Sequence, residues 1–145
     1  MQRKRNRLLR ADGKFRSKIG VSQRRARNIL GSIDFRAGVL TLVHFTMPDD
    51  PAEHVYLNNA CEVPQADPFR GDVVNSYNDG PKKNGQQLGA FYEIETLSPA
   101  KELKTNESLR HAHSTFHIQA DAETLGKLAK EALGIDLDAV RKAFF

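Results

Sequence analysis

The chain is poor in sulfur and in long apolar runs: it has a single cysteine, Cys61, no tryptophan and no stretch of hydrophobic residues long enough to span a bilayer. One thiol excludes an internal disulfide and a cysteine metal cluster. The arm 1–7 is followed only by Leu8 and Leu9 before Arg10, which is too short for the apolar core of a signal peptide. We therefore expect no membrane span and no export signal in this chain, and the localisation stays open.

Charge is distributed unevenly along the 145 residues. Residues 1–36 carry 12 Lys or Arg against 2 Asp, a net charge of +10, whereas the remainder carries 10 basic and 16 acidic residues, a net charge of −6. A basic nucleic-acid-binding domain using residues 1–27 is therefore one alternative. No finger spacing, basic-region heptad or aromatic binding-strand signature accompanies it, which disfavours nucleic acid as a partner. Apolar residues interrupt the segment, so only residues 1–7 are expected to form a free arm.

The apolar pattern predicts a mainly antiparallel β domain with a small helical tail. The glycine between residues 31–35 and 39–45 indicates a β-hairpin. Asp121 and Asp136 are placed to cap two short C-terminal helices. We expect the β domain to span residues 8–120 and the helices to pack on it from residues 121–145. The expected strands are residues 10–19, 31–35, 39–45, 71–77, 89–97 and 108–119.

Two glutamates, Glu93 and Glu95, stand two residues apart in the apolar strand 89–97. Successive side chains of a strand point to opposite faces, so both glutamates share one face, with Phe91, and the residues between them face the other way. A paired-acid face suits polar ligand binding. Solvent exposure of both carboxylates is the alternative.

Other polar residues are candidates for the same binding surface. Asn75, Tyr77 and Asp79 alternate along their strand and can offer hydrogen bonds and a stacking ring, although turn-forming roles suit Asp79 equally. Arg16 and Lys18 share a face and could hold an anionic group, which would favour an acidic sugar; a solvated edge is the alternative.

The histidines His111, His113 and His117 fall on one face of the last expected strand. Residues on one flat strand lie too far apart to converge on an ion, and no further acid or thiol completes a set, so we expect no metal. His113 is a candidate for a donor or substitute acid near the glutamates.

Four segments together carry a family resemblance: residues 15–20, 71–81, 89–100 and 108–119. They resemble the C-terminal half of an uncharacterised bacterial domain family that is related to galactose mutarotase-like, or aldose 1-epimerase-like, β-supersandwich proteins. The resemblance implies an antiparallel β-sandwich, half of a supersandwich, with a sugar-facing groove. In such epimerases a glutamate acts as general base and a histidine as general acid.

The resemblance implies that this base corresponds here to Glu95, which lies nearer the turn after the strand, or to Glu93. The acid histidine of the related enzymes belongs to an earlier half that this chain lacks, so we expect the catalytic machinery to be incomplete. The sequence therefore predicts a carbohydrate-binding, epimerase-like protein without a cofactor, whose open sheet edges favour a homo-oligomer. An assembly module that completes a partner's sheet is an alternative of a different class.

Overall fold

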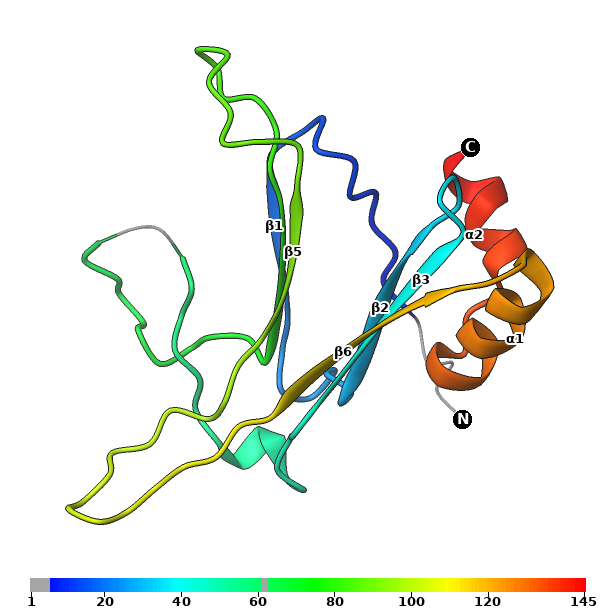
Figure 1. The fold of residues 1–145 in the computed structure, drawn as a ribbon. Coiled ribbons are helices and arrows are strands. Elements are labelled where there is room, and N and C mark those ends of the chain that lie inside the picture. The colour runs from blue at the N-terminus through cyan, green and yellow to red at the C-terminus, as the bar shows by residue number, and fades with distance from the viewer. Residues whose placement is uncertain (1–5, 61–62) are drawn as a thin grey trace. The chain divides into compact units, whose positions relative to one another are not determined.

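The computed structural model describes residues 6–60 and 63–145 and is mainly β, with two three-stranded sheets followed by two short helices (Figure 1). The coarse fold class expected from the sequence is confirmed. Most of the expected basic arm, residues 1–5, and Cys61 lie outside the described residues. No helix in the described ranges is long and apolar enough to cross a membrane.

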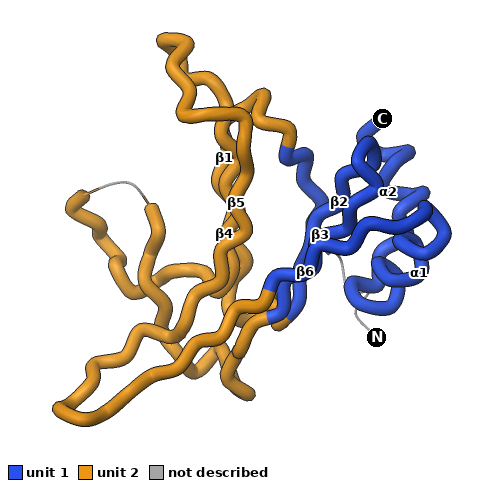
Figure 2. The backbone as a smooth tube through the Cα atoms, in the orientation of Figure 1, with its two compact units in different colours: residues 1–11, 29–44, 115–145 blue, residues 12–28, 45–114 orange. Residues whose placement is uncertain are grey.

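The chain forms two compact units, and each is built from separate segments (Figure 2). Unit 1 comprises residues 1–11, 29–44 and 115–145, and unit 2 comprises residues 12–28 and 45–114. The C-terminal helices thus share a unit with part of the β structure.

The first sheet lies in unit 2 and has the order β1–β4–β5. Its strands are β1 (Ser17–Val21), β4 (Val74–Asn78) and β5 (Tyr92–Thr96), and β4 pairs antiparallel with both neighbours. The register sets Tyr77 opposite Lys18 and Glu93, and Asn75 opposite Gly20 and Glu95. Residues that are distant in sequence are thereby aligned in two cross-strand rows.

The second sheet has the order β2–β3–β6, with β2 (Ile29–Asp34), β3 (Val39–Phe45) and β6 (His113–Gln119). The expected hairpin is present between β2 and β3, where Gly38 adopts a φ of 63°. This left-handed backbone is accessible to glycine at little cost, which explains the residue at the bend.

Helices α1 (Ala122–Leu133) and α2 (Leu137–Phe144) begin at the predicted caps. The Asp121 side chain accepts from the backbone N–H of Thr124, and Gly134 ends α1 in the left-handed conformation. Figure 1 shows both helices beside the second sheet. Their apolar sides form a core with Leu40 of β3; its other buried members are Leu125, Ala129 and Leu137.

Several strands are shorter than the sequence pattern predicts. The first begins at Ser17 rather than Arg10, because a turn at Gly13, with a φ of 68°, precedes it. The last begins at His113 rather than Ser108. Segment 53–60, which the pattern leaves between strand and loop, contains the end of a 3-10 turn, η1 (Pro51–Glu53), and an isolated bridge from Tyr56.

Candidate functional site

One face of the β1–β4–β5 sheet gathers most of the polar residues that the sequence singled out. We call this surface the polar face and define it by Lys18, Asn75, Tyr77, Glu93 and Glu95. The cross-strand pairs Lys18–Tyr77–Glu93 and Asn75–Glu95 place these side chains on the same side of the pleat. Three strands therefore contribute to one surface, and their assembly depends only on register.

Glu95 lies at the centre of the interactions on the polar face. Lys18 Nζ is 3.7 Å from Glu95 Oε1, and Asn59 Nδ2 donates to Glu95 Oε2 at 3.1 Å. Both carboxyl oxygens thus face donors, one of them a full positive charge.

Glu93 has a different environment although it lies only two residues away. Loss of hydrating water raises the pKa of the Glu93 carboxyl, and so do its hydrogen bond with the Glu95 side chain and the negative charge of Glu95, whereas Lys18 lowers it. The two neighbouring acids therefore differ in their surroundings, and a raised pKa is found at Glu93.

Asn75 supplies a buried donor between these groups. Its side chain is on the polar face opposite Glu95, and the residue is 5% exposed. Among residues 6–60 and 63–145, Asn75 Nδ2 has no hydrogen-bond partner. The buried hydroxyl group of Tyr56 likewise has no partner in these ranges. Buried amide donors are nearly always paired, so the unpartnered donor of Asn75 is an unusual feature.

Asp79 was a candidate ligand-binding residue, but its carboxyl group is engaged in hydrogen bonds inside the protein. Its side chain is fully buried and accepts hydrogen bonds from Tyr77 Oη, from Arg16 Nη2 at 2.7 Å and from the backbone N–H groups of Leu88 and Gly89 at 2.9 and 3.0 Å. The hydrogen bond from Tyr77 lowers the pKa of the Asp79 carboxyl, the backbone donors and Arg16 act in the same direction, and burial opposes them.

This network accounts for both Asp79 and Arg16. Arg16 also donates from Nε to the carbonyl oxygen of Gly80 at 3.2 Å, and its guanidinium lies 5.7 Å from the centre of the Tyr77 ring. The charged groups of Arg16 and Asp79 are thus engaged with each other and with the loop that follows β4. Their positions explain how that loop is held beside the polar face.

Two residues near the polar face carried no signal in the sequence. Asn59 reaches Glu95 from the excursion between η1 and β4. Asp72 lies against Gly20, because a Cβ atom added to Gly20 would overlap the Asp72 carboxylate. Gly20 is opposite Asn75, so this carboxylate lies on the same side of the sheet. Both residues precede β4 in loop segments; the sequence pattern placed Asp72 inside the expected strand 71–77, where alternation would have pointed it away from the face of Asn75.

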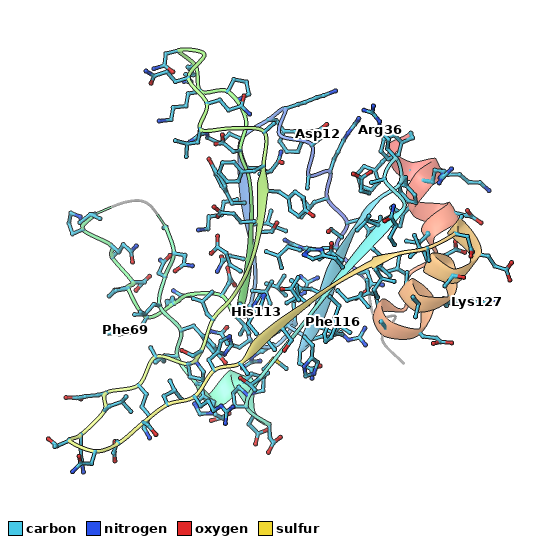
Figure 3. All side chains as sticks on the ribbon, viewed as in Figure 1. Asp12, Arg36, Phe69, His113, Phe116 and Lys127 are labelled. Atoms are coloured by element: carbon cyan, nitrogen blue, oxygen red, sulfur yellow. The ribbon has the colours of Figure 1, made fainter. Side chains whose placement is uncertain are left out.

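The histidines that the sequence singled out contact residues outside the polar face. His113, at the beginning of β6 (Figure 3), is 2.8 Å from Thr96 Oγ1, which His111 also contacts at 2.9 Å. Thr96 alternates with Glu95 and points to the opposite face of β5, so His113 is not placed as a substitute acid beside the glutamates. His117 contacts Thr41 at 3.0 Å. In the part of the chain that the structure describes, no cluster of three or more potential metal ligands is found.

Among the described residues, hollows on the surface include two that lie away from the polar face. One, of about 290 Å³, is lined by residues 82 and 86–88 of the loop after β4. The other, of about 510 Å³, is lined by residues along α1 and by the start of α2. Neither contains a residue of the polar face, so the candidate site is defined by its side chains and their unsatisfied hydrogen-bonding capacity.

Comparison with known proteins identifies a family. The model of a family of unknown function matches residues 1–144, nearly the whole chain. No curated protein and no solved structure matches the chain.

Proposed function

The chain belongs to DUF6786, a family of unknown function, and from that starting point we propose that it binds a carbohydrate on the polar face of the β1–β4–β5 sheet. The observation that carries this proposal is the buried, unpartnered Nδ2 donor of Asn75, the residue that is paired with Glu95 across β4 and β5. An unsatisfied buried donor costs about 1–3 kcal/mol, and a ligand oxygen that reached it would relieve this cost.

Sugar hydroxyl groups suit the donors and acceptors on this surface. A hydroxyl group can accept from Asn75 and donate to Glu95, and a neighbouring hydroxyl can interact with Lys18 or Glu93. The rings of Tyr77 and Phe91 have centroids 6.1 Å apart and give an apolar border for the C–H groups of a pyranose. An oxygen-rich ring with one apolar side would therefore find complementary groups.

The proposal includes a distant relationship to the mutarotase-like supersandwiches, with this chain corresponding to half of that architecture. Within it, Glu95 is the candidate base, and its carboxyl oxygens are oriented by Lys18 at 3.7 Å and Asn59 at 3.1 Å. His113 contacts Thr96 on the opposite face of β5, so the polar face does not gain the expected imidazole from it. We therefore propose binding rather than sugar epimerisation, and self-association stays a prediction.

Titration of the isotopically labelled full chain with neutral and acidic monosaccharides, followed by amide NMR, tests the proposal. We expect chemical shift changes at Lys18, Asn75 and Glu95, and their loss in Glu95→Gln. Glu102→Gln removes an equivalent charge at an exposed position outside the sheet and serves as the matched control. Unchanged spectra of the wild type with every sugar would reject carbohydrate binding.

A further inference from the structure

We propose that the polar face holds a chain of at least two linked, uncharged sugar rings, the first beside Asn75 and Glu95 and the second against the ring of Phe91. This inference rests on the proposed carbohydrate binding and extends it from a single ring to an oligosaccharide. The two ring positions follow each other along the direction of β4 and β5.

Three cross-strand rows lie one after another on this side of the β1–β4–β5 sheet. The backbone N–H of Asp79 donates to the carbonyl oxygen of Phe91 at 2.9 Å, and Arg16 Nη2 donates to Asp79 at 2.7 Å, so the alignment continues one row beyond the strand bounds. The rows are Gly20–Asn75–Glu95, Lys18–Tyr77–Glu93 and Arg16–Asp79–Phe91. Adjacent rows are two residues apart along a strand, so the first and third are separated by roughly 13–14 Å.

The groups suited to a sugar lie at opposite ends of these rows. The unpartnered donor of Asn75 and the carboxyl group of Glu95 belong to the first row and suit hydroxyl groups. The ring of Phe91 belongs to the third row, and its centroid lies 6.1 Å from that of Tyr77 in the second. One pyranose ring does not reach from the first row to the third, so the two ends fit two linked rings.

Phe91 gives the second ring an accessible apolar surface, because its side chain is 37% exposed. Tyr77 beside it is held in place: its hydroxyl group donates to Asp79, and the guanidinium of Arg16 lies 5.7 Å from its ring centre. A sugar ring that covers Phe91 removes apolar surface from water and meets a neighbour whose orientation is already fixed.

The charges of the three rows favour uncharged rings. Lys18 Nζ lies 3.7 Å from Glu95, and Arg16 forms an ion pair with Asp79, so both cations of the rows already face carboxylates. Glu93, between the two ring positions, is a further exposed acid. Carboxylates on a ligand would lie near these acids, whereas hydroxyl groups meet no such repulsion.

Titration of the isotopically labelled full chain, followed by amide NMR, compares D-glucose and D-galactose with the β-1,4-linked disaccharides cellobiose and lactose. We expect each disaccharide to bind at least about tenfold more tightly than the monosaccharides, because the second ring binds intramolecularly once the first is held. Shift changes near Asn75 and Glu95 should extend to Tyr77 and Phe91 only with the disaccharides. Digalacturonate should bind at least about tenfold more weakly than lactose.

The variants Phe91→Ala and Tyr92→Ala separate the second ring position from a general effect on β5. They remove neighbouring aromatic rings of similar exposure, 37% and 39%. Alternation points Tyr92 to the opposite face, so we expect Phe91→Ala to bring the ratio of disaccharide to monosaccharide affinity down to about one and Tyr92→Ala to keep the wild-type ratio. If Phe91→Ala does not fold, the wild-type titrations decide the inference on their own.

Equal affinity for disaccharides and monosaccharides, with shift changes confined to the first row, would overturn the inference and leave the proposed function in place. An unchanged affinity ratio in folded Phe91→Ala would have the same meaning, and so would equal affinity for digalacturonate and lactose. Binding of the disaccharides alone would support the inference. The absence of binding by every one of these sugars would instead reject carbohydrate binding itself.

Discussion

The guanidinium of Arg16 lies 2.7 Å from the carboxylate of Asp79, whose side chain is fully buried. The two residues are 63 positions apart, and the backbone N–H groups of Leu88 and Gly89 complete the coordination of the carboxylate. The ion pair thus ties the strand region at β1 to both ends of the loop between β4 and β5. It orders the border of the polar face without taking part in the ligand contacts proposed there.

Replacement of Asp79 should loosen this loop. In Asp79→Asn the carboxylate charge is lost, and Arg16 and the two backbone donors keep only a neutral acceptor. We expect a fall of several degrees in the melting temperature and faster amide exchange at Leu88 and Gly89. The control is Asp67→Asn, which removes the exposed pair with Arg70, where the side chains are 59% and 81% exposed. Such surface pairs contribute about 0–1 kcal/mol, so this variant should melt close to the wild type.

The same carboxylate predicts a specific dependence of stability on pH. The pKa of Asp79 is lower in the folded protein than its ordinary value of 3.8. Its contribution is therefore fully present above pH 3.8 and is lost as the pH falls through the folded pKa. Urea unfolding between pH 5 and the acid limit should show a steeper loss of stability in the wild type than in Asp79→Asn. Parallel curves for the two proteins would contradict the assignment.

Much of the polar face is accessible to prediction, because it follows from alternation along strands. Glu93 and Glu95 have to share a face, and so do Asn75 and Tyr77. The position of β4 between β1 and β5 then aligns these pairs with Lys18. The helix caps at Asp121 and Asp136 are equally local. These features depend on a few neighbouring residues, which is why sequence patterns report them.

The other features of the candidate site depend on contacts between segments that are distant in sequence. Asn59 reaches Glu95 from 36 residues away, and no periodicity fixes the direction of a loop side chain. The sequence does not decide whether Asp79 contacts a ligand or forms a turn, because its ion pair with Arg16 depends on the tertiary structure. The sequence also makes His113 a candidate near the glutamates. In the structure β6 belongs to the sheet of β3, and His113 contacts Thr96 on the opposite face of β5.

Two glycines give a matched pair of substitutions. In Gly20→Ala the added methyl would overlap the Asp72 carboxylate and force it to move, a rearrangement expected to destabilise the protein by about 1–3 kcal/mol. At Gly126 of α1 an added methyl would meet no atom within 4 Å, so Gly126→Ala should stabilise by about 0.5–1 kcal/mol through its higher helix propensity. Denaturant unfolding measures both. A neutral Gly20→Ala would show that Asp72 moves without cost.

His111 should make stability sensitive to mildly acidic pH. Burial lowers the pKa of its imidazole below the ordinary 6.5, and the neighbouring His113 lowers it further, against the opposing effect of Thr96. The neutral ring is therefore favoured by folding, so its contribution is present above pH 6.5 and is lost as the pH falls through the folded pKa. His111→Gln should flatten the stability profile below pH 6.5 in urea unfolding. The matched control is His54→Gln, at an exposed position, and this variant should keep the wild-type slope. An unchanged slope in His111→Gln would place the sensitivity on other groups.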